Sequence, residues 1–272
     1  MWFREFDDVF EKVTYPAGET HIRFRTGVCM DGYTILAEAR DFTDLCNIVV
    51  ADRVAKRHGV SPTWFVPYFP FARDDRRNTS YDGEELHLAM EMVKEIDIII
   101  ADPHSDVAGH LPHIPQSSSV SAFIGAGLFN GDPVIMIPDQ GATKKAYSWT
   151  GMVPDCEVVQ AGKVRDTATG NLSGFRLEVP DSFSFDNRPV VIVDDICDGG
   201  GTFLGLADEV IDQYGAGELR LGVTHGLFTR GVACLLDRFE MVMSFSDRPG
   251  PSYAGRAVHI SWQELYAVGE RV

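Results

Sequence analysis

The chain has 272 residues, of which 44% are hydrophobic and 24% are charged, and its formal net charge is −16. This composition is typical of a folded protein with two ordinary domains or one large one. The excess of acidic residues argues against binding to a nucleic-acid polymer, which needs a net basic surface. The net charge is compatible with the binding of small phosphorylated ligands, because these need only a local group of cations and backbone N–H groups.

Short aliphatic runs alternate with segments whose apolar residues recur at helical spacing. In chain order, the predicted strands are 34–36, 63–66, 96–101, 134–137, 157–160, 190–193, 219–224 and 241–245, and the predicted helices are 46–58, 84–94, 144–149 and 203–214. This alternation predicts an α/β fold in which mostly parallel sheets are flanked by helices. Turn-forming residues at 129–133 predict a division into two halves. Ligands of such sheets bind beyond the carboxyl ends of the strands.

The cellular setting is predicted from three further features. The N-terminal segment mixes acidic and basic residues and has no apolar core, so we expect no signal peptide. No run of about 18 apolar residues is present, so we expect no membrane-spanning segment. The five cysteines are scattered without a CxxC pair, which is typical of reduced thiols. We therefore expect a cytoplasmic protein.

The segment Val190–Thr202, VVIVDDICDGGGT, carries the clearest chemical signal. Four apolar residues predict a buried strand, which a pair of carboxylates ends. These carboxylates could accept hydrogen bonds from the hydroxyls of a ribose or hold Mg²⁺ through water. The glycines then let backbone N–H groups approach a phosphate at the start of the next helix, whose dipole favours its charge. The predicted site residues are Asp194, Asp195, Asp198, Gly199, Gly200, Gly201 and Thr202.

A plain strand–turn–helix connection is the alternative for this segment, although three consecutive glycines would be a costly way to build such a turn. The pattern resembles the phosphoribosyl-diphosphate loop shared by type I phosphoribosyltransferases and ribose-phosphate diphosphokinases (PRPP synthetases). Further segments resemble the diphosphokinase alone, in the family's order, over about residues 13 to 270. They are YPAGE at 15–19, YFPFARDDRR at 68–77, DPH at 102–104, IPDQG at 137–141, GKVRD at 162–166 and THGLF at 224–228.

The resemblance identifies a short, diverged and possibly phage-type member of the diphosphokinase family. It implies two tandem phosphoribosyltransferase-like domains. The first, at 1–132, would bind ATP, with the C-terminal segment 256–272 packing back onto it. The second, at 133–255, would carry the ribose-phosphate loop. The family builds its ATP site partly across a subunit interface, so the resemblance also implies a homo-oligomer.

The implied reaction is the Mg²⁺-dependent transfer of the diphosphoryl group of ATP to the 1-hydroxyl of ribose 5-phosphate. The catalytic residues implied by the Lys-x-Arg pair are Lys163 and Arg165. His104 and Asp139 are the implied metal ligands. The implied ATP-binding residues are Tyr15, Glu19, Arg73, Asp74, Asp75 and His104.

Three alternatives remain open. The family commonly has D-T-x-G-T in the phosphate loop, whereas this chain has Asp198-Gly199-Gly200-Gly201-Thr202, which removes a hydroxyl and adds space. The acceptor could therefore be a larger ribose phosphate such as ADP-ribose, as in phage-type NAD⁺ salvage. A type I phosphoribosyltransferase would leave the segments at 68–77 and 162–166 unexplained. A catalytically silent regulatory homologue would typically lack the loop cations or the metal histidine, which this chain retains.

Overall fold

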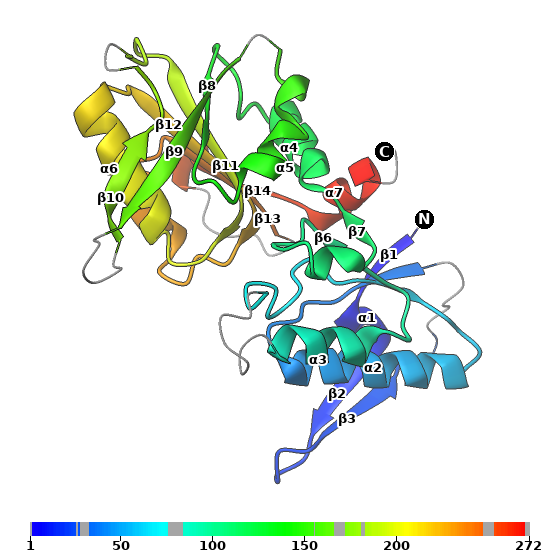
Figure 1. The fold of residues 1–272 in the computed structure, drawn as a ribbon. Coiled ribbons are helices and arrows are strands. Elements are labelled where there is room, and N and C mark those ends of the chain that lie inside the picture. The colour runs from blue at the N-terminus through cyan, green and yellow to red at the C-terminus, as the bar shows by residue number, and fades with distance from the viewer. Residues whose placement is uncertain are drawn as a thin grey trace. The chain divides into compact units, whose positions relative to one another are not determined.

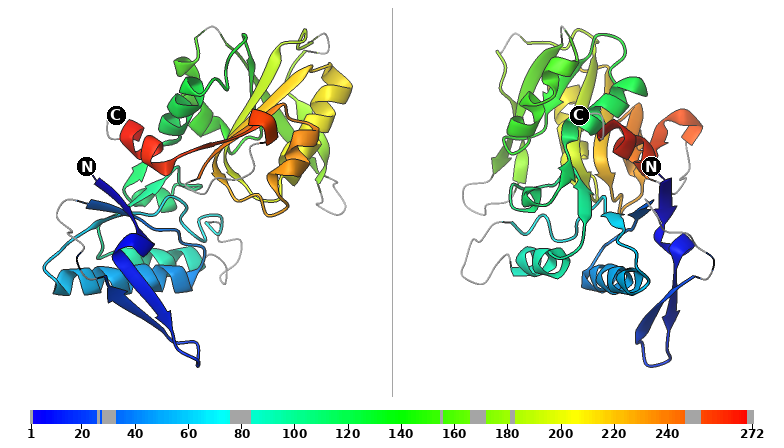
Figure 2. Two further views of the ribbon diagram at one scale, coloured as in Figure 1. Left: turned by 180° about the vertical axis from the view of Figure 1, so that it is seen from behind. Right: turned by 90° about the vertical axis from the view of Figure 1, so that its right-hand side faces the viewer.

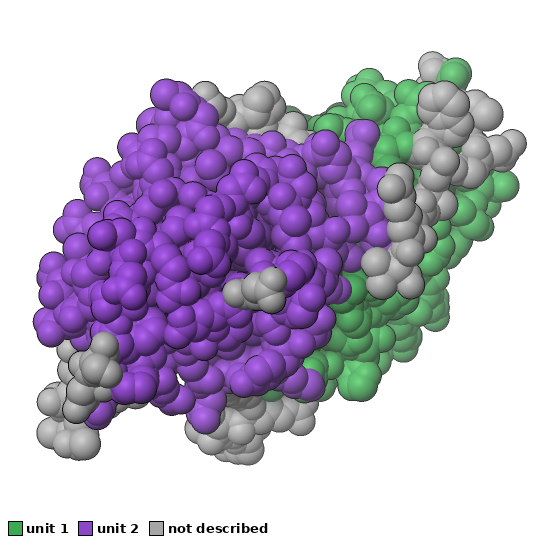
Figure 3. All heavy atoms as spheres, turned by 90° about the horizontal axis from the view of Figure 1, so that it is seen from above, with its two compact units in different colours: residues 1–115 green, residues 116–272 purple. Residues whose placement is uncertain are grey.

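The computed structural model describes residues 2–25, 27, 33–75, 84–154, 156–165, 172–180, 183–246 and 253–269. Contacts between Cα atoms divide the chain into unit 1, residues 1–115, and unit 2, residues 116–272 (Figure 3). Each unit has its own parallel sheet and its own buried apolar core. The predicted α/β fold with two mostly parallel sheets is confirmed. Among the described residues, no helix is long and apolar enough to cross a membrane.

Unit 1 contains a parallel sheet of five strands in the order β1-β4-β5-β6-β7 within the described residues. Helices α2 and α3 lie side by side (Figures 1 and 2). The elements are β1 (Trp2–Glu5), α1 (Phe6–Val9), β2 (Phe10–Thr14), β3 (Thr20–Phe24), β4 (Tyr33–Leu36), α2 (Phe42–Arg57), β5 (Thr63–Phe65), α3 (Glu84–Val93), β6 (Ile98–Ala101) and β7 (His113–Ile114).

Helix α2 begins four residues before the predicted start at Cys46 because Asp41 caps it. The carboxylate of Asp41 accepts a hydrogen bond from the backbone N–H of Asp44 at 3.0 Å. Such a cap satisfies one of the N–H groups that have no partner inside the helix. Strands β2 and β3 form an antiparallel hairpin outside the parallel sheet, which the sequence did not predict.

Unit 2 contains a seven-stranded sheet in the order β10-β9-β8-β11-β12-β13-β14 within the described residues, parallel except for the β9–β10 pair. Its elements are α4 (Gln116–Gly125), β8 (Val134–Ile137), α5 (Thr143–Tyr147), β9 (Glu157–Arg165), β10 (Leu172–Leu177), β11 (Pro189–Cys197), α6 (Gly201–Tyr214), β12 (Glu218–Gly226), β13 (Met241–Phe245), β14 (Ala257–Ile260) and α7 (Trp262–Gly269).

Helix α6 covers one face of this sheet, and α4 packs on the other (Figure 1). Alternating residues of β12 separate the two faces. Leu219, Leu221 and Val223 belong to the core shared with α6, whereas the hydroxyl of Thr224 donates a hydrogen bond to Ser119 of α4 at 3.0 Å.

The division between the units differs from the one predicted near residue 132. The turn at 129–133 lies inside unit 2, where Gly131 and Asp132 adopt left-handed φ values of 90° and 57°. These turn residues therefore lead into β8 and do not separate the two units. Strand β14 pairs with β13, and α7 contacts α4, so this C-terminal part belongs to unit 2.

Gly222 in β12 shows how closely α4 packs on the sheet. A Cβ atom at this position would lie 2.6 Å from Leu128 Cδ2 and 3.1 Å from the Phe123 ring. We expect Gly222→Ala to lower the free energy of unfolding by about 1–3 kcal/mol, because overpacking a core forces side chains and backbone apart. Chemical denaturation measures this change. Gly174→Ala in strand β10, where a Cβ would meet nothing within 4 Å, is the control and should change stability far less.

Candidate active site

The carboxyl ends of β8 and β11 bring three carboxylates together in unit 2. Asp139 follows β8, and β11 carries Asp194 and Asp195 near its end. These two strands are parallel neighbours, so their carboxyl ends lie at one edge of the sheet. Strand β11 continues to Cys197, beyond the predicted end at Val193, because Ile196 and Cys197 still pair with β12. The fold thus places Asp139 near Asp194 and Asp195, three residues that the sequence analysis assigned to metal or ribose-phosphate binding.

A lysine on α5 pairs with one of these carboxylates. The ammonium of Lys145 donates to Asp195 Oδ2 at 2.7 Å, and the Asp195 side chain is only 8% exposed. No local pattern links two residues that lie 50 positions apart, so the sequence gives no direct signal for this pair.

The carboxyl group of Asp194 is held in an environment that disfavours its charge. Burial raises the pKa of Asp194 well above its usual range, and the nearby carboxylates of Asp195 and Asp139 raise it further. The backbone N–H of Asp195 donates to Asp194 Oδ1 at 2.9 Å, which opposes this shift in part. A cationic ligand at this edge of the sheet would therefore be favoured electrostatically.

This raised pKa predicts a pH-dependent gain in stability for Asp194→Asn. The folded state binds the Asp194 proton more tightly than the unfolded state, so the wild type loses stability as the pH rises from about 4, the unfolded value, through the folded pKa. The variant should therefore unfold at a higher temperature than the wild type at neutral pH. This difference should vanish below pH 4. Calorimetry at several pH values measures it, with Asp212→Asn on the exposed side of α6 as control. An equal gain at all pH values would contradict this explanation.

The glycine loop connects β11 to α6, as the sequence predicted. Gly200 is the N-cap residue of α6 and has a left-handed φ of 77°. A Cβ atom at Gly200 would lie 2.9 Å from Leu235 Cδ2, and one at Gly199 would lie 3.2 Å from Arg230 Cδ. The space expected beside these two glycines is thus occupied by protein side chains. A Cβ at Gly201, by contrast, would meet nothing within 4 Å.

The cysteine that precedes this loop is not a suitable nucleophile. Cys197 is buried at the end of β11. Burial raises the pKa of its thiol to about 12, so it stays protonated at neutral pH. The chemistry available at this edge of the sheet therefore comes from carboxylates, a lysine and the backbone N–H groups that begin α6.

Unit 1 carries most of the predicted ATP-binding residues after two neighbouring parallel strands. Arg73, Asp74 and Asp75 follow β5, and His104 follows β6. Arg73 and His104 are exposed. The segment after β5 is anchored by Phe71, whose ring stacks on Phe42 with centroids 4.3 Å apart. The fold thus brings these polar residues to one edge of the first sheet.

The remaining predicted ATP residues form the turn of the β2–β3 hairpin. The backbone N–H of Tyr15 donates to the carbonyl of Glu19 at 2.8 Å, and that of Gly18 donates to Tyr15 at 2.8 Å. Gly18 has a left-handed φ of 93°, which favours glycine. Tyr15 and Glu19 are both exposed at this turn. They are therefore available for contact with a ligand or a second chain.

The predicted catalytic pair lies on the β9–β10 ribbon. Lys163 pairs with Phe175 of β10, and Arg165 pairs with Leu172. The side chains of Lys163 and Arg165 lie outside the described part of the structure. Strand β9 is five residues longer than the predicted strand at 157–160, because its antiparallel pairing with β10 continues to residue 165.

The carboxylates of unit 2 fit a magnesium ion held partly by substrate. Among the described residues, no group of three or more His, Cys, Asp or Glu side chains could hold a metal ion by itself. Mg²⁺ is usually bound through one or two carboxylates together with substrate phosphates. Asp139 supplies such a carboxylate, and its Oδ1 also accepts the backbone N–H of Ala142 at 3.1 Å. The second metal ligand implied by the sequence resemblance, His104, belongs to unit 1 and not to this group of carboxylates.

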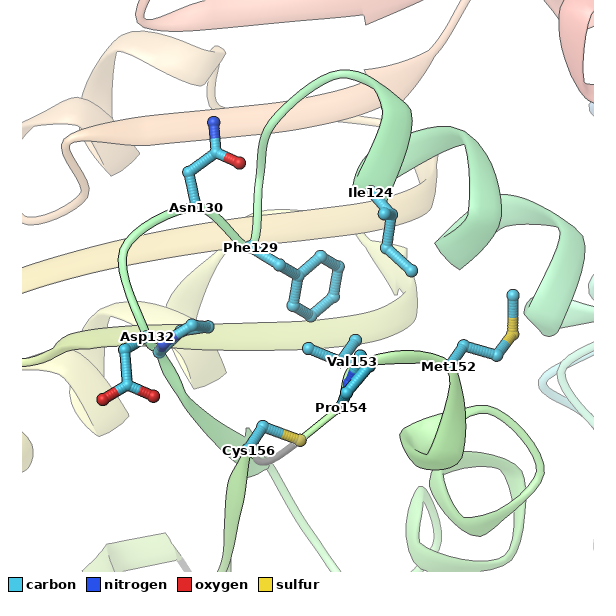
Figure 4. A pocket seen from close by; sticks show the side chains of 9 residues that line it. Ile124, Phe129, Asn130, Asp132, Met152, Val153, Pro154 and Cys156 are labelled. Carbon is cyan, nitrogen blue, oxygen red and sulfur yellow. The ribbon is translucent and has the colours of Figure 1, made fainter.

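A cavity of about 260 Å³ lies at the opposite edge of the second sheet. The side chains of Ile124, Phe129, Met152 and Val153 border one space (Figure 4). Pro133 precedes β8 and Cys156 precedes β9, so the cavity lies at the amino ends of these parallel strands. This position separates it from the carboxylates, and it is not part of the candidate active site.

Comparison with curated proteins finds relatives that share one name. A ribose-phosphate pyrophosphokinase from Methanopyrus kandleri is 28% identical over 255 residues, which cover 89% of this chain and 84% of that protein. The protein of the same name from Mycobacterium tuberculosis is 24% identical over 190 residues. That match covers 67% of this chain but only 57% of the mycobacterial relative. No family model matches the chain.

A solved structure has the same fold. The crystal structure of phosphoribosylpyrophosphate synthetase from Mycobacterium smegmatis superposes with a TM-score of 0.74 at 20% sequence identity. The alignment covers 97% of this chain and 91% of that one. The likeness thus extends over both units of the fold.

Proposed function

We infer that this chain, which belongs to the ribose-phosphate pyrophosphokinase family, transfers the β,γ-diphosphoryl group of ATP to the 1-hydroxyl of ribose 5-phosphate. The products would be phosphoribosyl diphosphate and AMP. The observation that carries the proposal is the end of β11, where Asp194, Asp195 and the glycine loop stand together at the start of α6. This arrangement suits a sugar with hydroxyls at one end and a phosphate at the other.

The acceptor would lie along the end of β11. Asp194 and Asp195 would accept hydrogen bonds from its ribose hydroxyls, which would place the 1-hydroxyl for attack. The backbone N–H groups at the start of α6 would hold the 5-phosphate, since the first N–H groups of a helix have no partner within it and its dipole favours an anion. Lys145 would orient Asp195 from the α5 side.

The donor would be positioned by the residues that the sequence resemblance assigns to ATP. Arg73 and His104 would contact the phosphates, and Tyr15 and Glu19 would approach adenine. Such a transfer requires in-line positioning and stabilisation of the charge on the moving group more than covalent chemistry. Lys163 and Arg165 would neutralise that charge. Asp139 would help to hold Mg²⁺, which would supply positive charge to offset that of the phosphates.

The acceptor is decided by incubating the protein with ATP, Mg²⁺ and either ribose 5-phosphate or ADP-ribose. We expect higher kcat/KM with ribose 5-phosphate, because Arg230 and Leu235 occupy the space beside Gly199 and Gly200 that a larger phosphate group was expected to use. Higher kcat/KM with ADP-ribose would show that the proposed acceptor is wrong, while the proposal of diphosphoryl transfer would stand. Release of diphosphate from phosphoribosyl diphosphate in the presence of a nucleobase would favour a phosphoribosyltransferase instead.

A further inference from the structure

The segment that follows β12 is fixed against the start of the phosphate loop. The backbone N–H groups of Leu227 and Phe228 donate to the carbonyl of Cys197 at 2.9 and 3.1 Å. Thr229 binds Asp198 twice, through its backbone N–H at 3.1 Å and its hydroxyl at 2.8 Å. These four hydrogen bonds hold the residue after Thr229 close to the loop that would receive the acceptor phosphate.

Arg230 is that residue, and its stem lies along the loop backbone. A Cβ atom built on Gly199 would be 3.2 Å from Arg230 Cδ and 3.6 Å from its Cγ. The guanidinium begins one bond beyond Cδ, so it lies within a few ångströms of the loop. Arg230 is exposed, and it forms no hydrogen bond or ion pair with any residue that the structure describes. The chain has 40 acidic and 24 basic residues, which makes an arginine without a carboxylate partner a candidate for ligand binding.

The loop itself has few side chains with which to bind a phosphate. Three of the five residues at 198–202 are glycines, and the carboxylate of Asp198 already accepts the Thr229 hydroxyl. Thr202 is left as the side-chain hydroxyl donor of the loop. A sugar phosphate monoester carries up to two negative charges and three non-bridging oxygens. Helix N–H groups compensate only part of that charge, so a nearby cation would add substantially to binding.

We propose that Arg230 is a specificity-determining residue whose guanidinium binds the terminal phosphate of the acceptor. This inference rests on the proposed function. A guanidinium presents a planar pair of N–H donors that matches two phosphate oxygens. A monoester phosphate offers a third oxygen to the backbone N–H groups of the loop at the same time. A phosphate inside a diphosphate bridge, as in ADP-ribose, has only two non-bridging oxygens and less charge. Arg230 therefore favours acceptors that end in a phosphate.

The test compares Arg230→Gln with Arg238→Gln, which removes the same charge from an exposed arginine paired with Asp208. For Arg230→Gln we expect the KM for ribose 5-phosphate to rise about 10- to 100-fold, the range for a lost hydrogen bond to a charged group. The KM for ATP and the kcat should change less than about threefold. Arg230→Lys should recover part of the loss. The relative kcat/KM for ADP-ribose should increase.

Calorimetric titration of ribose 5-phosphate without ATP separates this inference from the proposed function. The dissociation constant should rise with the KM in Arg230→Gln and stay near the wild-type value in Arg238→Gln. If the wild type and Arg230→Gln bind ribose 5-phosphate equally, the role of Arg230 is wrong while the proposed function stands. If the wild type neither binds nor converts ribose 5-phosphate, both are wrong.

Discussion

Lys163→Ala is expected to lower the kcat for diphosphoryl transfer by about 10²- to 10³-fold, with a much smaller change in either KM. Loss of one group that stabilises charge in the transition state typically has an effect of this size. Lys163 lies on the β9–β10 ribbon, and the reaction moves a highly charged diphosphoryl group. The rate of AMP release at saturating ATP and acceptor measures the effect.

The matched control is Lys144→Ala, which removes one charge from an exposed position on α5. This variant should keep a kcat within about twofold of the wild type, as expected for a surface charge. Equal rates for Lys163→Ala and the wild type would show that the assignment of the β9–β10 ribbon to catalysis is wrong. The assignment of the acceptor loop on β11 would be unaffected by that result.

Lys145→Met is expected to raise the KM for the acceptor by about tenfold or more and to lower the temperature of unfolding. The substitution removes the ammonium group that lies 2.7 Å from the buried Asp195 carboxylate, and breaking a buried ion pair by removing one partner is costly. It also increases the negative charge at the edge of the sheet where Asp139 and Asp194 already lie, which would repel the acceptor phosphate. Steady-state kinetics and calorimetry measure the two effects.

A double-mutant cycle with Asp195→Asn tests whether the ion pair is the cause. If it is, Lys145→Met should destabilise the wild type clearly more than it destabilises Asp195→Asn, since coupled residues are not additive. Lys145→Arg should restore much of the acceptor KM because it keeps the positive charge. Additive effects on stability, together with an unchanged KM for Lys145→Met, would show that the ion pair with Asp195 contributes neither to stability nor to acceptor binding.

The sequence predicted well those elements whose apolar pattern is strong and local. Strands β8 and β13 have the predicted bounds, and β11 has the predicted start within one residue. Helix α4 was missed because its sequence, QSSSVSAFIG, has three consecutive serines and little apolar periodicity. Ser118 and Ser119 are nevertheless buried, since tertiary packing overrides local propensity.

The candidate site was predictable in its residue types but not in all its contacts. The carboxylate pair and the glycine loop stand together because they follow one strand. The pairing of Lys145 with Asp195 and the close approach of the Arg230 side chain to Gly199 join segments that only the fold brings together. The expectation of extra space beside Gly199 and Gly200 failed for the same reason. The side chains that fill this space belong to residues 230 and 235, which only the fold brings to the loop.

Incubation with ATP labelled at the γ-phosphate, Mg²⁺ and ribose 5-phosphate tests diphosphoryl transfer most directly. The label should appear in a sugar diphosphate, and AMP should form in equal amount, because the β- and γ-phosphates move together. Formation of ADP with the label in a sugar bisphosphate would show transfer of a single phosphoryl group. That result, or the absence of any labelled sugar, would contradict the proposed function.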